Sequence, residues 1–278
     1  MIHSLRQLVV IGFAIGFLSG PGPALADADV AAGQIAFDGK AALVNSQAAI
    51  GRKLRDHRFV SADGKPVRIA DFSGKPLIIS LIYSSCYHTC PQITQSLARA
   101  IEVANDAFGS QKYEVVTIGF DTEFDKPAAM RSFARKQGID FSNWRFLSTD
   151  ATTVWRLSDD IGFQFTPSPR GFDHLTQTTI VGRDGHVYAQ VYGDDFATPQ
   201  LVDPLKNLIF SGGPWHSLNA ILDRVRLVCT TYDPARDAYY FDYSLFIGMA
   251  IGIVCLLVIV IFIYREFIQN RRIPPVQS

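Results

Sequence analysis

The sequence predicts an α/β domain, a mixed sheet flanked by helices, followed by one membrane-spanning helix. Continuous apolar runs such as PLIISLI predict strands buried on both faces of a sheet. Segments with apolar residues at helical spacing separate these runs, which is typical of strand–helix–strand crossover units. The stretch from Tyr243 to Tyr264 is uncharged and apolar, and it reaches the length of about 20 residues that crosses a bilayer.

The elements follow one another with clear punctuation. Asp63-Gly64 and Asp184-Gly185 predict tight turns between antiparallel strands, Pro127 the first turn of a helix, and Asp150 a helix cap. The predicted order is a hairpin at 58–72, a strand at 75–83, a helix from 91 to 109, a strand at 113–120, helices at 126–138 and 150–162, a strand pair at 175–193 and a helix at 199–210. Crossover units first and a hairpin last indicate a mixed sheet.

The two ends of the chain predict export and anchoring. Residues 1–26 have a short basic start, an apolar stretch and a small-x-small pattern ending at Ala26, as in a cleaved signal peptide. Residues 27–55 form an arm that is either loosely docked or helical. Arginines in the tail, 265–278, follow the span and predict a cytoplasmic C-terminus. The domain between the two apolar segments is therefore expected outside the cytoplasm.

The charge balance argues against one class of partner. Lys plus Arg number 26 and Asp plus Glu number 26. The globular part has no basic run with interleaved aromatic residues, so no strong electrostatic attraction to nucleic acid is expected. We therefore expect no nucleic-acid partner.

Two cysteines lie where a strand is followed by a helix. Cys86 and Cys90 share one helical face if the helix begins at or just before Cys86, or in the turn preceding it. The positive end of the helix dipole favours thiolates, which act as nucleophiles or as ligands of a soft metal ion. An oxidising compartment makes unused thiols unexpected. Cys255, inside the span, and Cys229 read more simply as packing residues, with an auxiliary thiol as the alternative for Cys229.

A soft ion such as Cu(I) needs more than two thiolates for a closed site, and imidazole is the natural third ligand. Among the histidines, His174 stands at the end of a Pro/Gly-rich loop where a strand is expected to begin, a usual place for a functional side chain. His57 and His186 lie at strand edges and are interpreted as solvated or hydrogen-bonded residues. Asp173 could orient the imidazole of His174.

Three segments together resemble one family. GKPLIISLIYSSCYHTCPQITQSL, with its CxxxCP motif, IGFDTEFDKPAAMRSFA and FDHLTQTTIVGRDGHVYAQVYG are similar, in order and spacing, to the Sco/SenC copper chaperones for cytochrome c oxidase assembly. The resemblance covers about residues 56–212. It implies a thioredoxin-like fold, and a disulfide-forming pair Cys86 and Cys90 that holds copper together with His174. It also implies a supporting role for Asp121.

The resemblance implies a function as well. Copper, as Cu(I), Cu(II) or both, would pass to the binuclear copper site of cytochrome c oxidase subunit II, and a thiol reductant or a copper donor would be a further partner. Family members are commonly anchored by an N-terminal helix, whereas this chain is predicted to have a linker at 213–242 and a C-terminal span at 243–264. We expect a metallochaperone rather than an enzyme. The alternative is a membrane-tethered thiol:disulfide reductase, which uses the same thiols and does not need His174.

Overall fold

A computed structural model describes residues 37–210, 225 and 229–271. The predicted signal at 1–26 lies outside the described residues, and so do the first ten residues of the arm, most of residues 213–228 and the last seven residues of the tail.

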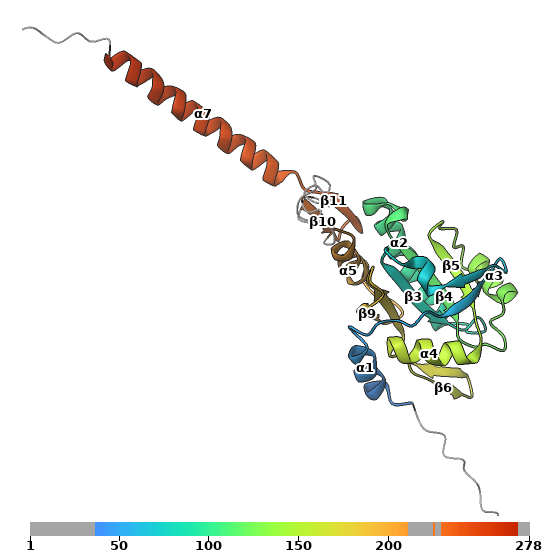
Figure 1. Ribbon diagram of the computed structural model, residues 1–278. Coiled ribbons are helices and arrows are strands. Elements are labelled where there is room, and N and C mark those ends of the chain that lie inside the picture. Colours follow the sequence, from blue (N-terminus) through green and yellow to red (C-terminus); the bar gives the residue numbers. More distant parts are fainter. Residues whose placement is uncertain (1–36, 211–224, 226–228, 272–278) are drawn as a thin grey trace, which may run out of the picture. The chain divides into compact units, whose positions relative to one another are not determined.

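A seven-stranded mixed sheet forms the centre of the domain (Figure 1). Its order is β2-β1-β5-β4-β3-β8-β9, with β3, β4 and β5 parallel and the other pairings antiparallel. The strands are β1 Arg58–Ser61, β2 Pro66–Arg68, β3 Leu77–Ile82, β4 Glu114–Gly119, β5 Trp144–Ser148, β8 Gln177–Val181 and β9 Val187–Tyr192. Every residue of β3 and of β8 is buried, so both faces of these two strands are covered, as the apolar run of β3 predicts.

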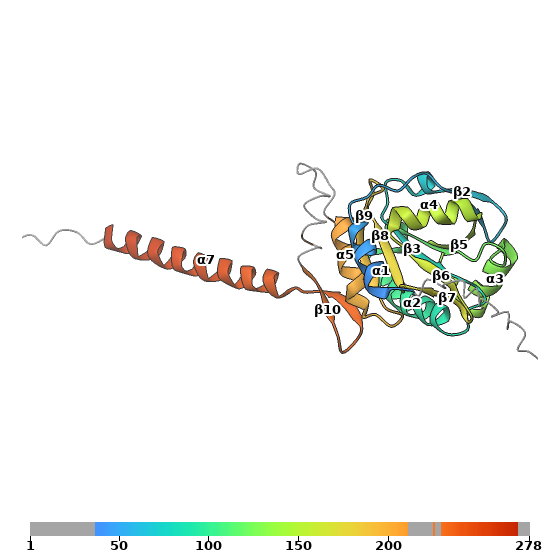
Figure 2. The same ribbon diagram turned by 90° about the horizontal axis from the view of Figure 1, so that it is seen from below.

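Helices cover both faces of this sheet. They are α1 Gly39–Ala48, α2 Thr89–Phe108, α3 Pro127–Lys136, α4 Ala151–Ile161 and α5 Thr198–Phe210, with short 3-10 turns η1 Ile69–Phe72 and η2 Ser110–Lys112. Figures 1 and 2 show α2 and α4 on opposite sides of the strands. The mixed α/β architecture predicted from the sequence is confirmed.

Local signals in the sequence explain where two of the helices begin and end. Asp150 accepts a hydrogen bond from the backbone N–H of Thr153 at 2.9 Å and so caps α4, as predicted. Gly162 ends α4 in the left-handed conformation with φ of 67°. Pro127 stands in the first turn of α3, where its missing N–H costs no hydrogen bond. The predicted arm, 27–55, contains a helix in its described part: α1, which Asp38 caps.

The segment before β8 differs from its prediction as a loop. It forms a separate two-stranded hairpin, β6 Phe165–Ser168 and β7 Gly171–His174, in which Phe165 pairs with His174. The prolines of this segment discouraged a strand prediction, but a two-stranded hairpin has free edges that accept a residue without an N–H. His174 therefore ends one strand and does not begin the next.

A second hairpin occupies part of the predicted linker. β10 Thr230–Asp233 and β11 Ala238–Phe241 pair in antiparallel register. Lys206 Nζ on α5 donates to the carbonyl of Thr230 at 2.7 Å, and the hydroxyl of Tyr239 donates to Asp203 at 2.7 Å. The hairpin is therefore held on the domain by specific contacts.

The last described helix is α7, Ser244–Arg271. Its part Ser244–Ile268 is long and apolar enough to cross a membrane, and none of its most apolar window is covered by the rest of the described chain. This matches the helix predicted from the uncharged stretch.

Candidate metal centre

Cys86 lies in the turn that joins β3 to α2, and Cys90 is the second residue of α2. α2 begins at Thr89, two residues before the predicted start at Pro91, so the condition for a shared helical face, a helix that begins at or just before Cys86, is not met. Cys86 is placed by its backbone N–H, which donates to the carbonyl of Tyr83 at 3.1 Å. Cys90 is 1% exposed and its backbone N–H donates to Cys86 Sγ at 3.3 Å. Although Cys86 precedes α2, its sulfur therefore lies at the amino end of that helix.

The two sulfurs have opposite acid–base character. A hydrogen bond from the Cys90 thiol, together with backbone N–H groups of Cys90 and His88 and the Tyr83 hydroxyl, lowers the pKa of Cys86 to about 4. The same hydrogen bond and burial raise the pKa of Cys90. At neutral pH the pair is one thiolate and one thiol, which share a proton between them.

His174 lies in an aromatic surrounding. Its ring centroid is 5.6 Å from that of Phe120 and 5.5 Å from that of Phe163. Burial lowers the pKa of His174, against smaller opposing effects from the Leu175 carbonyl and the charge of Cys86. The imidazole is therefore neutral at pH 7.

One ring nitrogen of His174 is available. Nδ1 lies 3.2 Å from the carbonyl oxygen of Leu175, an acceptor that requires Nδ1 to carry the proton. Nε2 is then unprotonated, and no residue in the described part of the chain hydrogen-bonds to it. A neutral imidazole with a bare Nε2 lone pair is what a metal ligand requires.

Tyr83 stands between the thiols and the histidine. Its ring centroid is 6.3 Å from that of His174, and its hydroxyl is among the groups that lower the pKa of Cys86. The cavity beside them, of about 500 Å³, is lined by Tyr83, Thr89 and His174 among others. Within the described ranges no three His, Cys, Asp or Glu side chains are already gathered closely enough to hold an ion. The structure pairs Cys86 with Cys90 and places His174 across Tyr83 from them.

The two predicted supporting acids lie at the edge of this arrangement. Asp173 is exposed, and within the described residues its carboxylate makes no hydrogen bond to His174, whose Nδ1 is held by the Leu175 carbonyl instead. Asp121 is half-buried, and its backbone carbonyl closes the turn after β4 by accepting from the N–H groups of Phe124 and Asp125. Burial, with the nearby charge of Glu123, raises the pKa of Asp121.

Asp125 is a functional candidate that the sequence interpretation missed. It is 1% exposed, and its carboxylate accepts from the backbone N–H of Ser84 at 2.8 Å and of Asp121 at 3.0 Å. Burial raises the pKa of Asp125 despite these hydrogen bonds. Asp125 thus fastens the turn that bears Cys86 to the turn after β4. The only sequence signal was an acid placed just before Lys126-Pro127 at a helix start.

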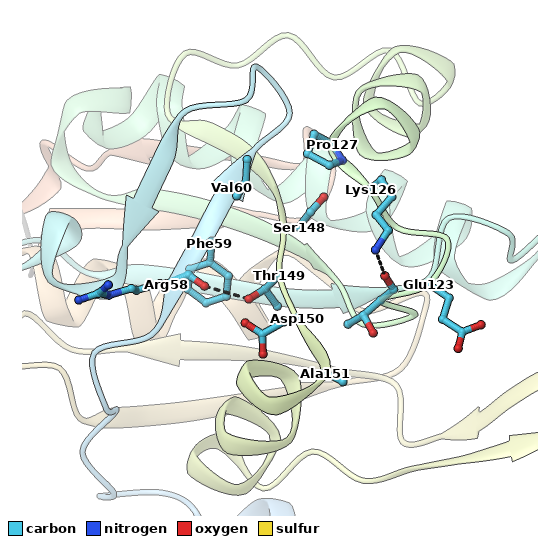
Figure 3. Close-up of a pocket in the computed structure, with 11 residues that line it drawn as sticks. Arg58, Phe59, Val60, Glu123, Lys126, Pro127, Ser148, Thr149, Asp150 and Ala151 are labelled. Carbon is cyan, nitrogen blue, oxygen red and sulfur yellow. Dashed lines mark hydrogen bonds between the residues drawn. The ribbon is translucent and has the colours of Figure 1, made fainter.

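A second cavity lies at the same edge of the sheet, where β4 and β5 end (Figure 3). It measures about 620 Å³, and Lys126 and Ser148 are among its lining residues. Lys126 donates to the carbonyl of Thr122 at 2.7 Å and Thr149 to that of Arg58 at 2.8 Å. Neither cysteine of the pair nor His174 lines this cavity, so it is separate from the thiol site.

Comparisons with known proteins place this fold and site in context. The SCO1 protein homolog of Bacillus subtilis (strain 168) is 25% identical over 142 residues, which are 49% of this chain and 71% of that protein. The crystal structure of a putative electron transfer protein from Aquifex aeolicus VF5 matches with a TM-score of 0.54 and 25% identity over 61% of this chain and 99% of that one. Bradyrhizobium japonicum ScoI, solved with copper bound, matches with 20% identity and a TM-score of 0.48 over 57% of this chain and 99% of its own.

The predicted thioredoxin-like fold is confirmed by the match to the Aquifex aeolicus structure. The family model described as SCO1/SenC matches residues 46–209, which is more than half of the chain and includes Cys86, Cys90 and His174. This chain belongs to the SCO1/SenC family.

Proposed function

We propose that this chain is a membrane-tethered, exported copper chaperone that delivers its ion to the binuclear copper site of cytochrome c oxidase subunit II. Cys86 and Cys90 supply two sulfur ligands and His174 supplies Nε2. The observation that carries the proposal is a thiolate–thiol pair facing a neutral histidine that has one bare nitrogen. Membership of the SCO1/SenC family supports the copper assignment.

The side chains supply the steps of binding and release. The Cys86 thiolate is ready to bind at neutral pH, whereas Cys90 must lose its proton as the ion enters. His174 binds without losing a proton, because its Nε2 is already bare. Three soft or borderline ligands suit Cu(I), and exchange of one protein ligand at a time for a ligand of the acceptor releases the ion.

The thiols and the histidine are tested by copper stoichiometry. The reduced full-length chain in detergent should bind about one copper per molecule. Cys86→Ser/Cys90→Ser should bind none, and His174→Ala should bind more weakly. His88→Ala is a matched control, because His88 lies between the cysteines but is exposed. Stoichiometric binding by the double cysteine variant would refute the proposal.

A second candidate is a thiol:disulfide reductase, favoured by the low pKa of Cys86 beside a buried thiol. The Cys86 thiolate would attack a disulfide of the partner and release one partner thiolate. Cys90 would then displace the second, which leaves a reduced partner and a Cys86–Cys90 disulfide that an external dithiol must reduce. His174→Ala separates the candidates, since it should weaken copper binding and leave reduction of a model disulfide unchanged.

We also propose the topology predicted from the sequence. The signal would be removed after Ala26, the copper domain at 56–212 would be exported, and the span at 243–264 would leave the tail inside. The apolar helix α7 and the arginines Arg265 and Arg271 support this orientation. A reporter that works only in the cytoplasm should be active when it is fused after Ser278. N-terminal sequencing of the mature protein should begin at Asp27.

A further inference from the structure

The cavity at the carboxyl ends of β4 and β5 lies where the chain changes from one face of the sheet to the other (Figure 3). β3, β4 and β5 are parallel neighbours, and right-handed crossovers in one direction place α2 and α3 on the same face. α4, which follows β5, lies on the face opposite α2. The connections that leave β4 and β5 therefore diverge, and such a crevice is the general place for a ligand in an open α/β sheet.

One wall of this cavity holds a buried hydroxyl without a partner. Ser148 is the last residue of β5 and is 4% exposed. No group in the described residues hydrogen-bonds to its Oγ. Figure 3 shows this oxygen directed toward the start of α3, where Lys126 and Pro127 lie. Because a buried hydroxyl without a hydrogen bond is unfavourable, its position indicates a ligand that bonds to it.

The start of α3 offers hydrogen-bond donors to the same space. Lys126 is the N-cap residue, and its side chain makes no capping hydrogen bond. Pro127 has no N–H, and the N–H groups of Ala128 and Ala129 have no acceptor among the described residues. The ammonium of Lys126 stays in this turn, where it donates to the carbonyl of Thr122 at 2.7 Å. Free N–H groups, the positive end of the helix dipole and a cation together favour an anionic ligand.

The acids that line the cavity limit the charge of this ligand. Both carboxylate oxygens of Asp150 accept from Thr153, through its backbone N–H at 2.9 Å and its hydroxyl at 3.0 Å. Glu123 is exposed, and in Figure 3 its carboxylate and the guanidinium of Arg58 are both directed away from Ser148. Two nearby negative charges oppose a dianion more than a monoanion. A carboxylate therefore suits the site better than a phosphate.

We propose that this cavity binds a small organic acid, with its carboxylate between the hydroxyl of Ser148 and the amino end of α3. Val60 pairs with Ser148 across the sheet and is 39% exposed, and it lines the cavity together with Pro127. These two side chains offer apolar surface to a short carbon chain. The volume, about 620 Å³, lies in the range of small-molecule sites. The site is separate from the thiol cavity and does not depend on the proposed copper function.

The test uses butyrate as the probe, titrated at constant ionic strength into the full-length chain in detergent. TROSY NMR follows the backbone amide resonances of Ala128 and Ala129. Both should shift saturably, with a Kd of about 1–10 mM for so small a ligand. Butylammonium, which has a similar length and the opposite charge, should cause no saturable shift. Inorganic phosphate should bind more weakly than butyrate.

Two variants and a matched control locate the site. Ser148→Ala should weaken butyrate binding about tenfold, because a hydrogen bond to a charged group is lost. Lys126→Gln should weaken it about threefold, since an exposed charge acts through solvent. Ser158→Ala is the control: Ser158 is also 4% exposed with an unpartnered Oγ in the described structure, but it lies on α4 and does not line the cavity. Its butyrate affinity should equal that of wild type.

Three results would overturn the proposal. They are the absence of a saturable shift at Ala128 and Ala129, a butyrate affinity of Ser148→Ala within twofold of wild type, and tighter binding of phosphate than of butyrate. Amide resonances remote from the cavity show whether each variant keeps its fold, and Lys126→Gln changes only an exposed side chain. Copper stoichiometry is measured separately, so a failure at this cavity leaves the proposed function untouched.

Discussion

Two histidines of this domain have opposite surroundings. His57 is 5% exposed, and its Nε2 lies 2.6 Å from a carboxylate oxygen of Asp160. The same carboxylate accepts from Arg55 through both its side chain at 2.7 Å and its backbone at 2.9 Å. His174 is surrounded by aromatic rings, has only a backbone carbonyl on Nδ1, and keeps Nε2 bare.

The difference separates a histidine with a structural role from one whose Nε2 is free to bind a metal ion. The Nε2 of His57 is committed to a buried carboxylate, and moving it would remove one of the two residues that hydrogen-bond to Asp160. The Nε2 of His174 has no such commitment among the described residues. What distinguishes His174 is an unused lone pair beside a cavity, and its ring is also less buried than that of His57.

The largest expected effect concerns the committed histidine. Asp160→Asn removes the charge that His57 and Arg55 share, so the free energy of unfolding should fall by about 3 kcal/mol. Urea unfolding of the full-length chain measures this change. Copper affinity should stay at the wild-type value, and a loss of affinity without a loss of stability would contradict the contrast between the two histidines.

The complementary change is His174→Gln. Removing a direct ligand should weaken copper binding by more than about 100-fold, since even the partners of ligands are worth 10- to 100-fold. Stability should change little, because no carboxylate depends on the ring in the described structure. Competition with a copper chelator gives the affinity. His57→Gln should show the reverse pattern, stable affinity and reduced stability.

A smaller effect is the pH dependence of copper affinity. The pKa of Cys86 is lowered to about 4 and that of His174 is also lowered, so neither holds a proton to be displaced near neutrality. The pKa of Cys90 is raised, so its proton must leave when the ion binds. Affinity should therefore rise about tenfold per pH unit between pH 6.5 and 8. A copper affinity that does not change with pH in this range would show that Cys90 does not lose its proton when the ion binds.

The smallest effect concerns acid stability. Burial of Asp160 opposes ionisation, but hydrogen bonds from His57 and Arg55 outweigh it and lower the pKa of Asp160. A lowered folded-state pKa stabilises the fold above the unfolded value, about 3.9, and this contribution is lost as pH falls through the folded value. Wild type should thus lose more stability than Asp160→Asn on acidification below about pH 4. Unfolding midpoints compared between pH 5 and pH 3 measure this.

The sequence predicted the parts of the fold whose residues carry a periodic signal. The all-apolar run of β3 and the helical spacing in α2 were sufficient. β5 was missed because it is short and has exposed Arg145 among its buried residues. The hairpin β6–β7 was missed because its prolines and Gly171 indicate a loop unless the approach of Tyr83 is known.

The candidate site was predictable to a similar extent. Spacing identified Cys86 and Cys90, and elimination among the histidines left His174. Tyr83 packs its ring against Phe172, and Asp125 accepts hydrogen bonds from backbone N–H groups. Those contacts join segments separated by up to 89 positions along the chain, and no local pattern records them.

The β10–β11 hairpin changes how the domain is joined to α7. Only Asp242 and Tyr243 lie between the end of β11 and the start of α7, and β10–β11 is fastened to α5. A long flexible linker would let the domain take any orientation at any distance within its reach. A linker of two residues leaves mainly rotation of the domain about the end of α7. In a bilayer, the thiols would then search a narrow range of heights above the lipid. Copper transfer to an acceptor site at another height above the lipid would then be inefficient, even where the acceptor protein is abundant.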